Sequence, residues 1–203
     1  MSKNPTLNLP VICTRGVVVF PGQDVMVEVG RPKSINAVEE SSNSYDNMVF
    51  ITCQKDIMVE DPKVDDVYSI GTLSKIKVIR RKDGFMRVTF TGMKRARMIS
   101  LEDSKHMMVA TIEPLDEIQG ISAITLTDQF AQFFPFDIAV KQQLLEELNL
   151  NERMLIIINE LEVNNYSKGK PIIAVDDNPL KVGKRIRGIP VKGTCDQIPE
   201  LTK

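Results

Sequence analysis

The chain has 203 residues, of which 42% are hydrophobic, and a formal net charge of −1 from 26 basic and 27 acidic side chains. This length allows one domain or two small ones with a buried core, and the near-neutral charge excludes the strong field of a dedicated nucleic-acid or membrane-surface protein. Three widely spaced cysteines, Cys13, Cys53 and Cys195, predict neither a disulfide framework nor a zinc site. No stretch approaches the roughly 18 apolar residues of a membrane span, so we expect a cytoplasmic protein without membrane contact.

Two strands are expected in residues 9–30, the stretch around which the rest of the chain is organised. Residues 17–20 are four consecutive apolar residues that end at Pro21 and Gly22, a pattern that predicts a strand stopping there. Three valines alternating with Met and Glu over residues 25–29 predict a second, half-buried strand.

A short helix and a buried strand are expected next. Ser34 is a suitable N-cap for a helix that ends near Asn43. Residues 48–53 form a continuous apolar run, which is typical of a strand covered on both faces. Four acidic residues around Pro62 then indicate a solvated loop.

Strand patterns return from Val67 onward. The Asp83-Gly84 pair predicts a tight hairpin, because it supplies the positive φ angles that two-residue turns require. Gly92 is expected to end the returning strand, and a last pair of strands is expected over residues 96–101 and 107–112. About six strands and one short helix predict a compact, mostly antiparallel β barrel or pseudo-barrel, followed by helices in an α+β chain.

Helical periodicity replaces the strand pattern beyond residue 115. Amphipathic helices are predicted over residues 124–134, 137–148 and 152–162, with Asp137 as N-cap of the second and Asn151 as N-cap of the third. Because such short helices cannot bury their apolar faces alone, we expect them to pack on one another or on the strands.

Three regions are therefore predicted: a β domain over residues 7–117, a helical subdomain over 118–166 and a tail over 167–203. Four prolines and four glycines exclude long helices from the tail. Residues 171–175 and 186–191 are suited to short strands, although a flexible tail is the favoured interpretation.

No catalytic or metal site is predicted, and no cofactor. A phosphate-binding loop needs a second glycine followed by Lys and Ser or Thr, whereas Gly183 and Lys184 are followed by Arg185, and Asn178 replaces the first glycine. His106, the only histidine, is expected at a solvated strand edge rather than in a catalytic triad.

Several short motifs occur in an order that resembles one family. They are Leu9-Pro10, residues 18–22, residues 29–32 with Ser34, residues 37–39, residues 54–56, Tyr68, Gly71-Thr72, Asp83-Gly84, Gly92 and Arg95-Ala96. This series resembles the N-terminal domain of the ATP-dependent protease Lon from residue 9 to about 115. The segment PFDIAVKQQLLEELNLNERM is similar to the helix, turn and helix that follow in Lon.

The resemblance implies a PUA-like β pseudo-barrel that recognises unfolded or damaged polypeptides and helps to organise the oligomer of Lon subunits. It implies structural roles for the motif residues Phe20, Pro21, Gly22, Gly30, Arg31, Gly71, Gly84 and Gly92. A longer chain of this family would be an ATP-dependent serine endopeptidase, whose nucleotide and peptidase sites are not in these residues. Two departures stand out: the region between Leu115 and Phe130 is shorter than in Lon, and a long charged helix is missing after Tyr166.

A basic stretch over residues 75–97 supports an alternative hypothesis. It holds nine basic residues and one acid, Asp83, and because PUA-like barrels can bind RNA it predicts a nucleic-acid surface. Its leading candidates are Lys75, Lys77, Arg80, Arg81, Lys82 and Arg87. The favoured interpretation is that these side chains occupy the outward positions of two-faced strands.

Four phenylalanines cluster around Pro135, and they have two interpretations. Phe130, Phe133 and Phe134 share one face of the predicted helix, with Phe136 close behind, so a packed core is the default expectation. The alternative is an exposed apolar groove for unfolded polypeptide, because contiguous apolar surface marks interaction sites.

Overall fold

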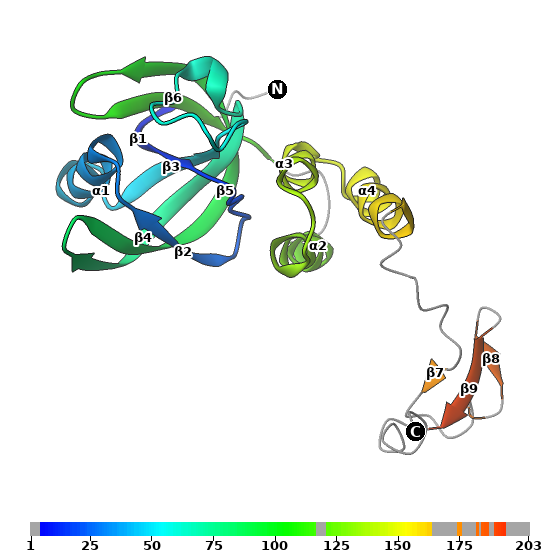
Figure 1. The fold of residues 1–203 in the computed structure, drawn as a ribbon. Coiled ribbons are helices and arrows are strands. Elements are labelled where there is room, and N and C mark those ends of the chain that lie inside the picture. Colours follow the sequence, from blue (N-terminus) through cyan, green and yellow to red (C-terminus); the bar gives the residue numbers. More distant parts are fainter. Residues whose placement is uncertain are drawn as a thin grey trace. The chain divides into compact units, whose positions relative to one another are not determined.

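The computed structural model describes residues 5–116, 121–163, 174–175, 182, 184–186 and 189–193. The chain divides into two compact units, Met1–Ile156 and Ile157–Lys203. All strands and helices between Leu7 and Glu146 belong to the first unit (Figure 1). No helix in the described part of the chain is long and apolar enough to span a membrane.

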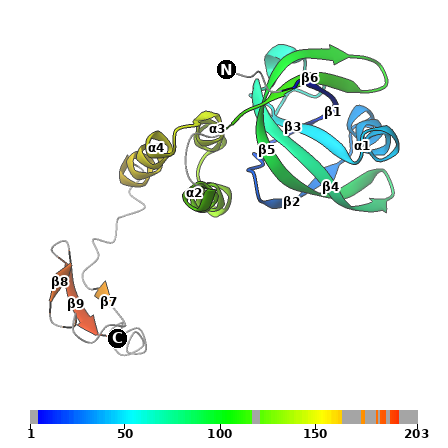
Figure 2. The same ribbon diagram turned by 180° about the vertical axis from the view of Figure 1, so that it is seen from behind.

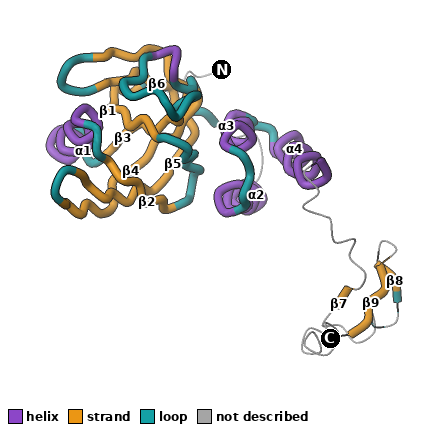
Figure 3. The backbone as a smooth tube through the Cα atoms, viewed as in Figure 1, coloured by secondary structure: helices purple, strands orange, loops and turns teal. Residues whose placement is uncertain are grey.

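A six-stranded mixed sheet forms the first part of this unit. Its strands are β1 (Leu7–Thr14), β2 (Asp24–Val29), β3 (Met48–Cys53), β4 (Ile70–Lys82), β5 (Phe85–Asp103) and β6 (Met108–Pro114). They are ordered β2-β5-β4-β3-β1-β6, and β5 also pairs with β6, so the sheet curls back on itself (Figures 1 and 3). Only β1 and β3 run parallel; the other pairs are antiparallel. The predicted pseudo-barrel of about six strands is confirmed.

The helix between β2 and β3, α1 (Pro32–Ser44), begins two residues before the expected N-cap. Arg31 has the extended N-cap conformation and Pro32 occupies the first turn, where its fixed φ and missing N–H are tolerated. Ser34 therefore lies inside the first turn, and its expected role as N-cap is wrong. The helix buries Ala37 and Val38 completely, on the side of the strands remote from the next two helices of the same unit (Figures 1 and 2).

Two groups of apolar side chains form the core of the β domain. The first lies with α1 and comprises Ile12, Val19, Val29, Ala37, Val38, Val49, Ile51, Ile76, Met86, Val88 and Phe90. The second comprises Leu9, Val11, Cys13, Phe50, Val67, Leu73, Ala96, Met108, Ala110 and Ile112. Strands β1 and β3 contribute to both groups with alternate residues, as expected for strands covered on both faces.

Residues 17–20 are buried but are not a strand, contrary to the sequence-based prediction. The strand here is β1, and residues 17–20 lie in an irregular segment with Phe20 fully buried. Side chains and one turn replace the ladder here: Thr72 Oγ1 donates to Val19 O at 2.6 Å, Phe20 N donates to Gln132 Oε1 at 3.3 Å, and Gln23 N donates to Phe20 O at 3.3 Å. An apolar run alone cannot distinguish a strand from such a buried crossing.

Gly92 does not end a strand either, because β5 continues through it to Asp103. A Cβ atom at Gly92 would lie 2.2 Å from Phe20 O, so the glycine allows the irregular segment to cross β5. Two short hydrogen bonds fix the crossing: Gly22 N to Gly92 O at 2.8 Å and Gly92 N to Gln23 O at 2.9 Å.

Replacing Gly92 by Ala is therefore expected to destabilise the protein by about 3 kcal/mol, near the upper end of overpacking costs. The contact is with backbone, which cannot move aside without disturbing the crossing. The matched control is Gly30→Ala, since Phe85 Cβ at 3.8 Å is the nearest atom there. The midpoint of urea denaturation should be lower for Gly92→Ala and unchanged for Gly30→Ala. Equal midpoints for both variants would contradict the role of Gly92 in the crossing.

The helices that follow lie close to their predicted positions. They are α2 (Ile121–Phe133), α3 (Ile138–Glu146) and α4 (Leu150–Val163). Asp137 is the N-cap residue of α3 but makes no capping hydrogen bond with its side chain. Asn149, not Asn151, caps α4: its Oδ1 accepts a hydrogen bond from Asn151 N at 2.9 Å.

The described residues of the tail form three short strands, β7 (Ala174–Val175), β8 (Arg185–Ile186) and β9 (Ile189–Gly193), in the order β7-β9-β8. Both predicted segments thus contain described strand residues. Cys195 and the predicted boundary between residues 117 and 118 lie outside the described residues, so the three-region division stays a prediction.

Candidate functional site

A buried ion pair joins the β domain to the helices. Arg95 of β5 and Asp128 of α2 are 0% and 1% exposed. The guanidinium and the carboxylate face each other edge to edge, with NH1 to Oδ2 at 2.9 Å and NH2 to Oδ1 at 2.6 Å. Arg153 of α4, also fully buried, adds a contact from NH1 to Asp128 Oδ1 at 3.1 Å. This bidentate geometry sets the orientation of α2 as well as its position.

The second positive charge is balanced by backbone carbonyls at the end of α3. Arg95 Nε donates to Leu145 O at 2.8 Å, and Arg153 Nε and NH2 donate to Glu147 O at 3.1 and 2.7 Å. The last carbonyls of a helix have no partner within the helix and carry the negative end of its dipole. Since α3 has no basic residue in its last turn, β5 and α4 supply the missing positive charge.

Further hydrogen bonds hold α3 and the end of α2 in place. Gln142 Nε2 donates to Ile70 O of β4 at 2.9 Å, and Lys141 Nζ donates to Gln132 O at 2.9 Å. Burial lowers the pKa of Lys141. The end of α2, where the phenylalanines lie, is therefore tied to the β domain at several points.

Three of the four candidate phenylalanines pack together. The rings of Phe130 and Phe134 stack with centroids 4.8 Å apart, and Phe136 lies 4.6 Å from Phe134 and 6.0 Å from Phe130. Phe136 is 6% exposed and belongs to the core, whereas Phe133 is 77% exposed. The cluster is thus partly core and partly surface, between the two interpretations drawn from the sequence.

The exposed side of this cluster forms an apolar hollow, here called the phenylalanine hollow. Its volume is about 390 Å³, and it is lined by Leu126, Gln129, Phe130, Phe133, Phe134 and Pro135. Leu126, which the sequence analysis did not single out, is 67% exposed. Its spacing from Phe130 and Phe133, four and seven residues, was the signal that could have identified it. A hollow with one amide and no charge is suited to apolar side chains.

The basic stretch is divided by the fold into paired and unpaired residues. Lys77 pairs with Asp24 at 2.5 Å, Arg81 with Glu39 at 2.9 Å and Arg87 with Glu28 at 2.8 Å. Among the six candidates, Lys75, Arg80 and Lys82 are exposed without an ion pair in the described part of the chain. Because half of these positive charges face a carboxylate, the stretch supports RNA binding less well than its composition indicated.

Several motif residues have roles in the backbone. A Cβ atom at Gly71 would lie 2.3 Å from Ile51 O, and Gly84 has a φ of +83° at the tip of the β4–β5 hairpin. Asp83 does not share this positive φ, so only one of the two predicted angles is present. Arg31 donates from NH2 to Gln54 Oε1 at 2.5 Å.

The two described cysteines, Cys13 and Cys53, are buried in the β domain. Burial raises the pKa of the Cys13 thiol to about 12 and also raises that of Cys53, so both thiols stay protonated at neutral pH, the form that is a poor nucleophile. His106 is exposed in the β5–β6 hairpin, where Asn36 Nδ2 donates to its carbonyl oxygen at 2.8 Å.

Comparisons with known proteins point to one family. The model of the "ATP-dependent protease La (LON) substrate-binding domain" matches residues 8–125. The Lon protease of Haemophilus influenzae is 28% identical over 226 positions, covering 93% of this chain and 26% of that protein. The Lon protease of Halothermothrix orenii is 38% identical over 112 positions, covering 55% of this chain and 14% of that protein. The solved N-terminal domain of Mycobacterium avium complex Lon protease has a TM-score of 0.64 at 17% identity, covering 77% of this chain and 98% of that one.

The chain spans only about a quarter of the Haemophilus protein. The alignment is longer than the chain itself, so that relative carries residues that this chain lacks. The solved N-terminal domain of a Xanthomonas campestris Lon protein shares the fold too, with a TM-score of 0.58 at 15% identity, covering 75% of this chain and 98% of that one. Because the family model matches more than half of the residues, the chain belongs to the family of Lon substrate-binding domains.

Proposed function

We propose that this domain binds unfolded polypeptide segments through the phenylalanine hollow and presents them to the ATPase and peptidase parts of a Lon-type protease. The observation that supports this proposal best is the exposure of Phe133 and Leu126, at 77% and 67%, beside a stacked aromatic pair. Soluble domains expose few such contiguous apolar surfaces unless something binds there. The domain itself takes no part in bond cleavage and requires no cofactor.

The attachment of the hollow to the β domain supports the same proposal. Asp128 on α2 is held by two buried arginines, and Gln132 near the end of α2 accepts a hydrogen bond from Phe20 N. A binding surface on a well-held element loses little conformational entropy when a ligand binds. Contacts with other Lon subunits through this domain are a further part of the proposal.

Replacing Phe133 by Ser is expected to weaken the binding of an unfolded protein at least tenfold and to leave stability unchanged within about 0.5 kcal/mol, as is usual for exposed positions. A suitable probe is reduced, carboxymethylated α-lactalbumin, measured by fluorescence anisotropy. Leu126→Ser should have a similar effect, since both side chains line the hollow.

The matched control is Met93→Ser, which removes an apolar side chain of 50% exposure from β5. It should bind the unfolded protein as the unchanged chain does. Equal affinity of all three variants would show that the hollow is not the binding site, and weakening by all three would show that the probe binds to exposed apolar residues in general.

A further inference from the structure

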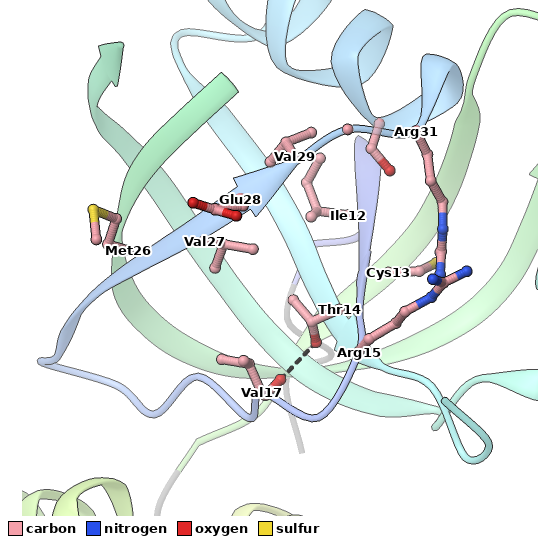
Figure 4. A pocket seen from close by; sticks show the side chains of 12 residues that line it. Ile12, Cys13, Thr14, Arg15, Val17, Met26, Val27, Glu28, Val29 and Arg31 are labelled. Carbon is pink, nitrogen blue, oxygen red and sulfur yellow. Dashed lines mark hydrogen bonds between the residues drawn. The ribbon is translucent and has the colours of Figure 1, made fainter. Parts of the chain in front are cut away.

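The pseudo-barrel has an open seam between β1 and β2. Within the described residues, β2 pairs with β5 only, so its other edge carries no strand. The first half of β1 pairs with β6, but this pairing ends at Pro10, and residues 11–14 pair with β3 alone. A cleft of about 460 Å³ lies between these two edges, within the usual size range of ligand pockets (Figure 4).

The ladder positions show which backbone groups face this cleft from β2. Gly92 N of β5 donates a hydrogen bond to Gln23 O, just before β2. Every second residue of an antiparallel strand forms hydrogen bonds with its partner strand. Counting on from Gln23, the three valines of β2 are therefore the residues whose backbone groups bond to β5. The N–H and C=O groups of Met26 and Glu28 therefore point away from β5, toward the open edge. They have the geometry to pair with an added strand.

The same reasoning applies to the second half of β1. Thr14 O accepts a hydrogen bond from Gln54 N at 2.9 Å, which directs the backbone groups of Thr14 toward β3. Those of Cys13, the preceding residue, point to the opposite side. The cleft is lined by consecutive residues of both strands, Ile12 to Thr14 and Met26 to Val29, as expected where strand edges rather than one sheet face form the walls.

Strand β2 also lacks the usual protection of an exposed edge. Its sequence, DVMVEV, contains neither lysine nor proline, and Met26 is 62% exposed. Its two acids pair with basic residues of neighbouring strands, Asp24 with Lys77 and Glu28 with Arg87. The two charges of this strand are therefore paired within the domain, and its outer edge is open to an extended chain.

Two arginines mark one end of the cleft. Figure 4 shows the side chains of Arg15 and Arg31 reaching toward each other beyond β1. Burial lowers the pKa of Arg31, and the positive charge of the neighbouring Arg15 lowers it further. Neither forms an ion pair with a described acid; Arg15 donates to Val59 O and Arg31 to Gln54 Oε1. Asp61 and Glu60 act on Arg31 in the opposite direction without forming an ion pair with it, and a carboxylate bound in the cleft would relieve the remaining repulsion.

We propose that the seam binds an extended polypeptide segment, which adds as a strand to the open edge of β2 and directs an acidic side chain to Arg15 and Arg31. Main-chain hydrogen bonds would supply sequence-independent affinity, and the arginine pair would select the acidic residue. This inference rests on the proposed function, because it assumes that the domain binds polypeptides. It places a second, charge-selective contact on the β domain, separate from the phenylalanine hollow.

Three labelled peptides test the proposal by fluorescence anisotropy. The first is acetyl-Lys-Thr-Val-Thr-Glu-Thr-Val-Thr-Lys-amide, the second has Gln in place of Glu, and the third is N-methylated at alternate residues. We expect the glutamate peptide to bind about tenfold more tightly than the glutamine peptide. The N-methylated peptide should bind at least tenfold more weakly than the glutamate peptide. Equal binding of all three would overturn the proposal.

Two variants of the protein locate the site. Arg15→Gln, at an exposed position, should remove the preference for glutamate while retaining the affinity for the glutamine peptide. Met26→Pro removes an N–H that faces the open edge. It should weaken the binding of both the glutamate and the glutamine peptide at least tenfold while the ladder to β5 persists. Unchanged peptide binding by folded Met26→Pro would contradict strand addition. Should that variant fail to fold, Arg15→Gln and the N-methylated peptide decide the question.

The same peptides and variants also distinguish two alternatives to the proposal. A wild-type dimer in sedimentation that becomes monomeric in Met26→Pro, without peptide binding, would assign the seam to a second copy of the chain and overturn the proposal.

Carboxymethylated α-lactalbumin distinguishes the seam from the phenylalanine hollow. If Phe133→Ser abolishes its binding while the peptides do not bind, the seam proposal fails alone. If the peptides bind but Phe133→Ser changes nothing, the proposed role of the hollow fails instead.

Discussion

Replacing Asp128 by Asn is expected to cost about 3–5 kcal/mol of stability, the usual cost of removing one partner from a buried ion pair. Among the described residues, Asp128 supplies the carboxylate that contacts the buried guanidinium groups of Arg95 and Arg153. Without its charge, both guanidinium groups lose this buried carboxylate and keep their hydrogen bonds to the carbonyl groups at the end of α3. Because stabilities of 5–15 kcal/mol are typical of domains, this single atom change would remove a large share.

The measurement is urea denaturation followed by circular dichroism, with amide exchange of α2 and α3 as a second readout. Glu39→Gln is the matched control, because it makes the same change in the exposed pair with Arg81 and should cost less than about 1 kcal/mol. A separate early loss of protection in α2 and α3 would show that the ion pair mainly holds the helices to the β domain. An Asp128→Asn midpoint equal to that of Glu39→Gln would contradict the structural role of Asp128.

Replacing Phe20 by Ala is expected to destabilise the protein by about 3–5 kcal/mol, as for other fully buried aromatic residues. Phe20 is 0% exposed, and the guanidinium carbon of Arg95 lies 6.0 Å from its ring centroid. The ring therefore fills the space beside the buried ion pair, and its removal would leave a cavity next to a charged group. The residue also belongs to the segment that crosses β5 at Gly92.

Phe133→Ala is the matched control for this change, since the same ring is removed from a position that is 77% exposed. It should change the free energy of unfolding by less than about 0.5 kcal/mol. A double variant, Phe20→Ala with Asp128→Asn, should lose less stability than the sum of the losses in the two single variants. The reason is that both side chains lie against Arg95. Full additivity would show that Phe20 and the ion pair act independently.

Local patterns were sufficient for much of the β domain. Strand β3 coincides with the apolar run of residues 48–53, β2 with the alternating valines, and the hairpin with the Asp83-Gly84 pair. Each of these signals depends on neighbours within a few residues, so the sequence contains all the information needed. The strand pattern and the family resemblance both predicted the pseudo-barrel, which is confirmed, and helical spacing identified the phenylalanines that lie in or beside the hollow.

Sequence alone thus determined the strands, the helices and the class of fold, because these follow from periodicity and turn chemistry. Only the tertiary structure decided that residues 17–20 cross the sheet without joining it, and that Arg95, counted among surface charges, is a buried partner of Asp128. The open seam beside β2 also emerged only from the strand order. The physical reason is common to all three: each depends on partners distant in the chain, and a side chain's type does not reveal which distant group it will meet.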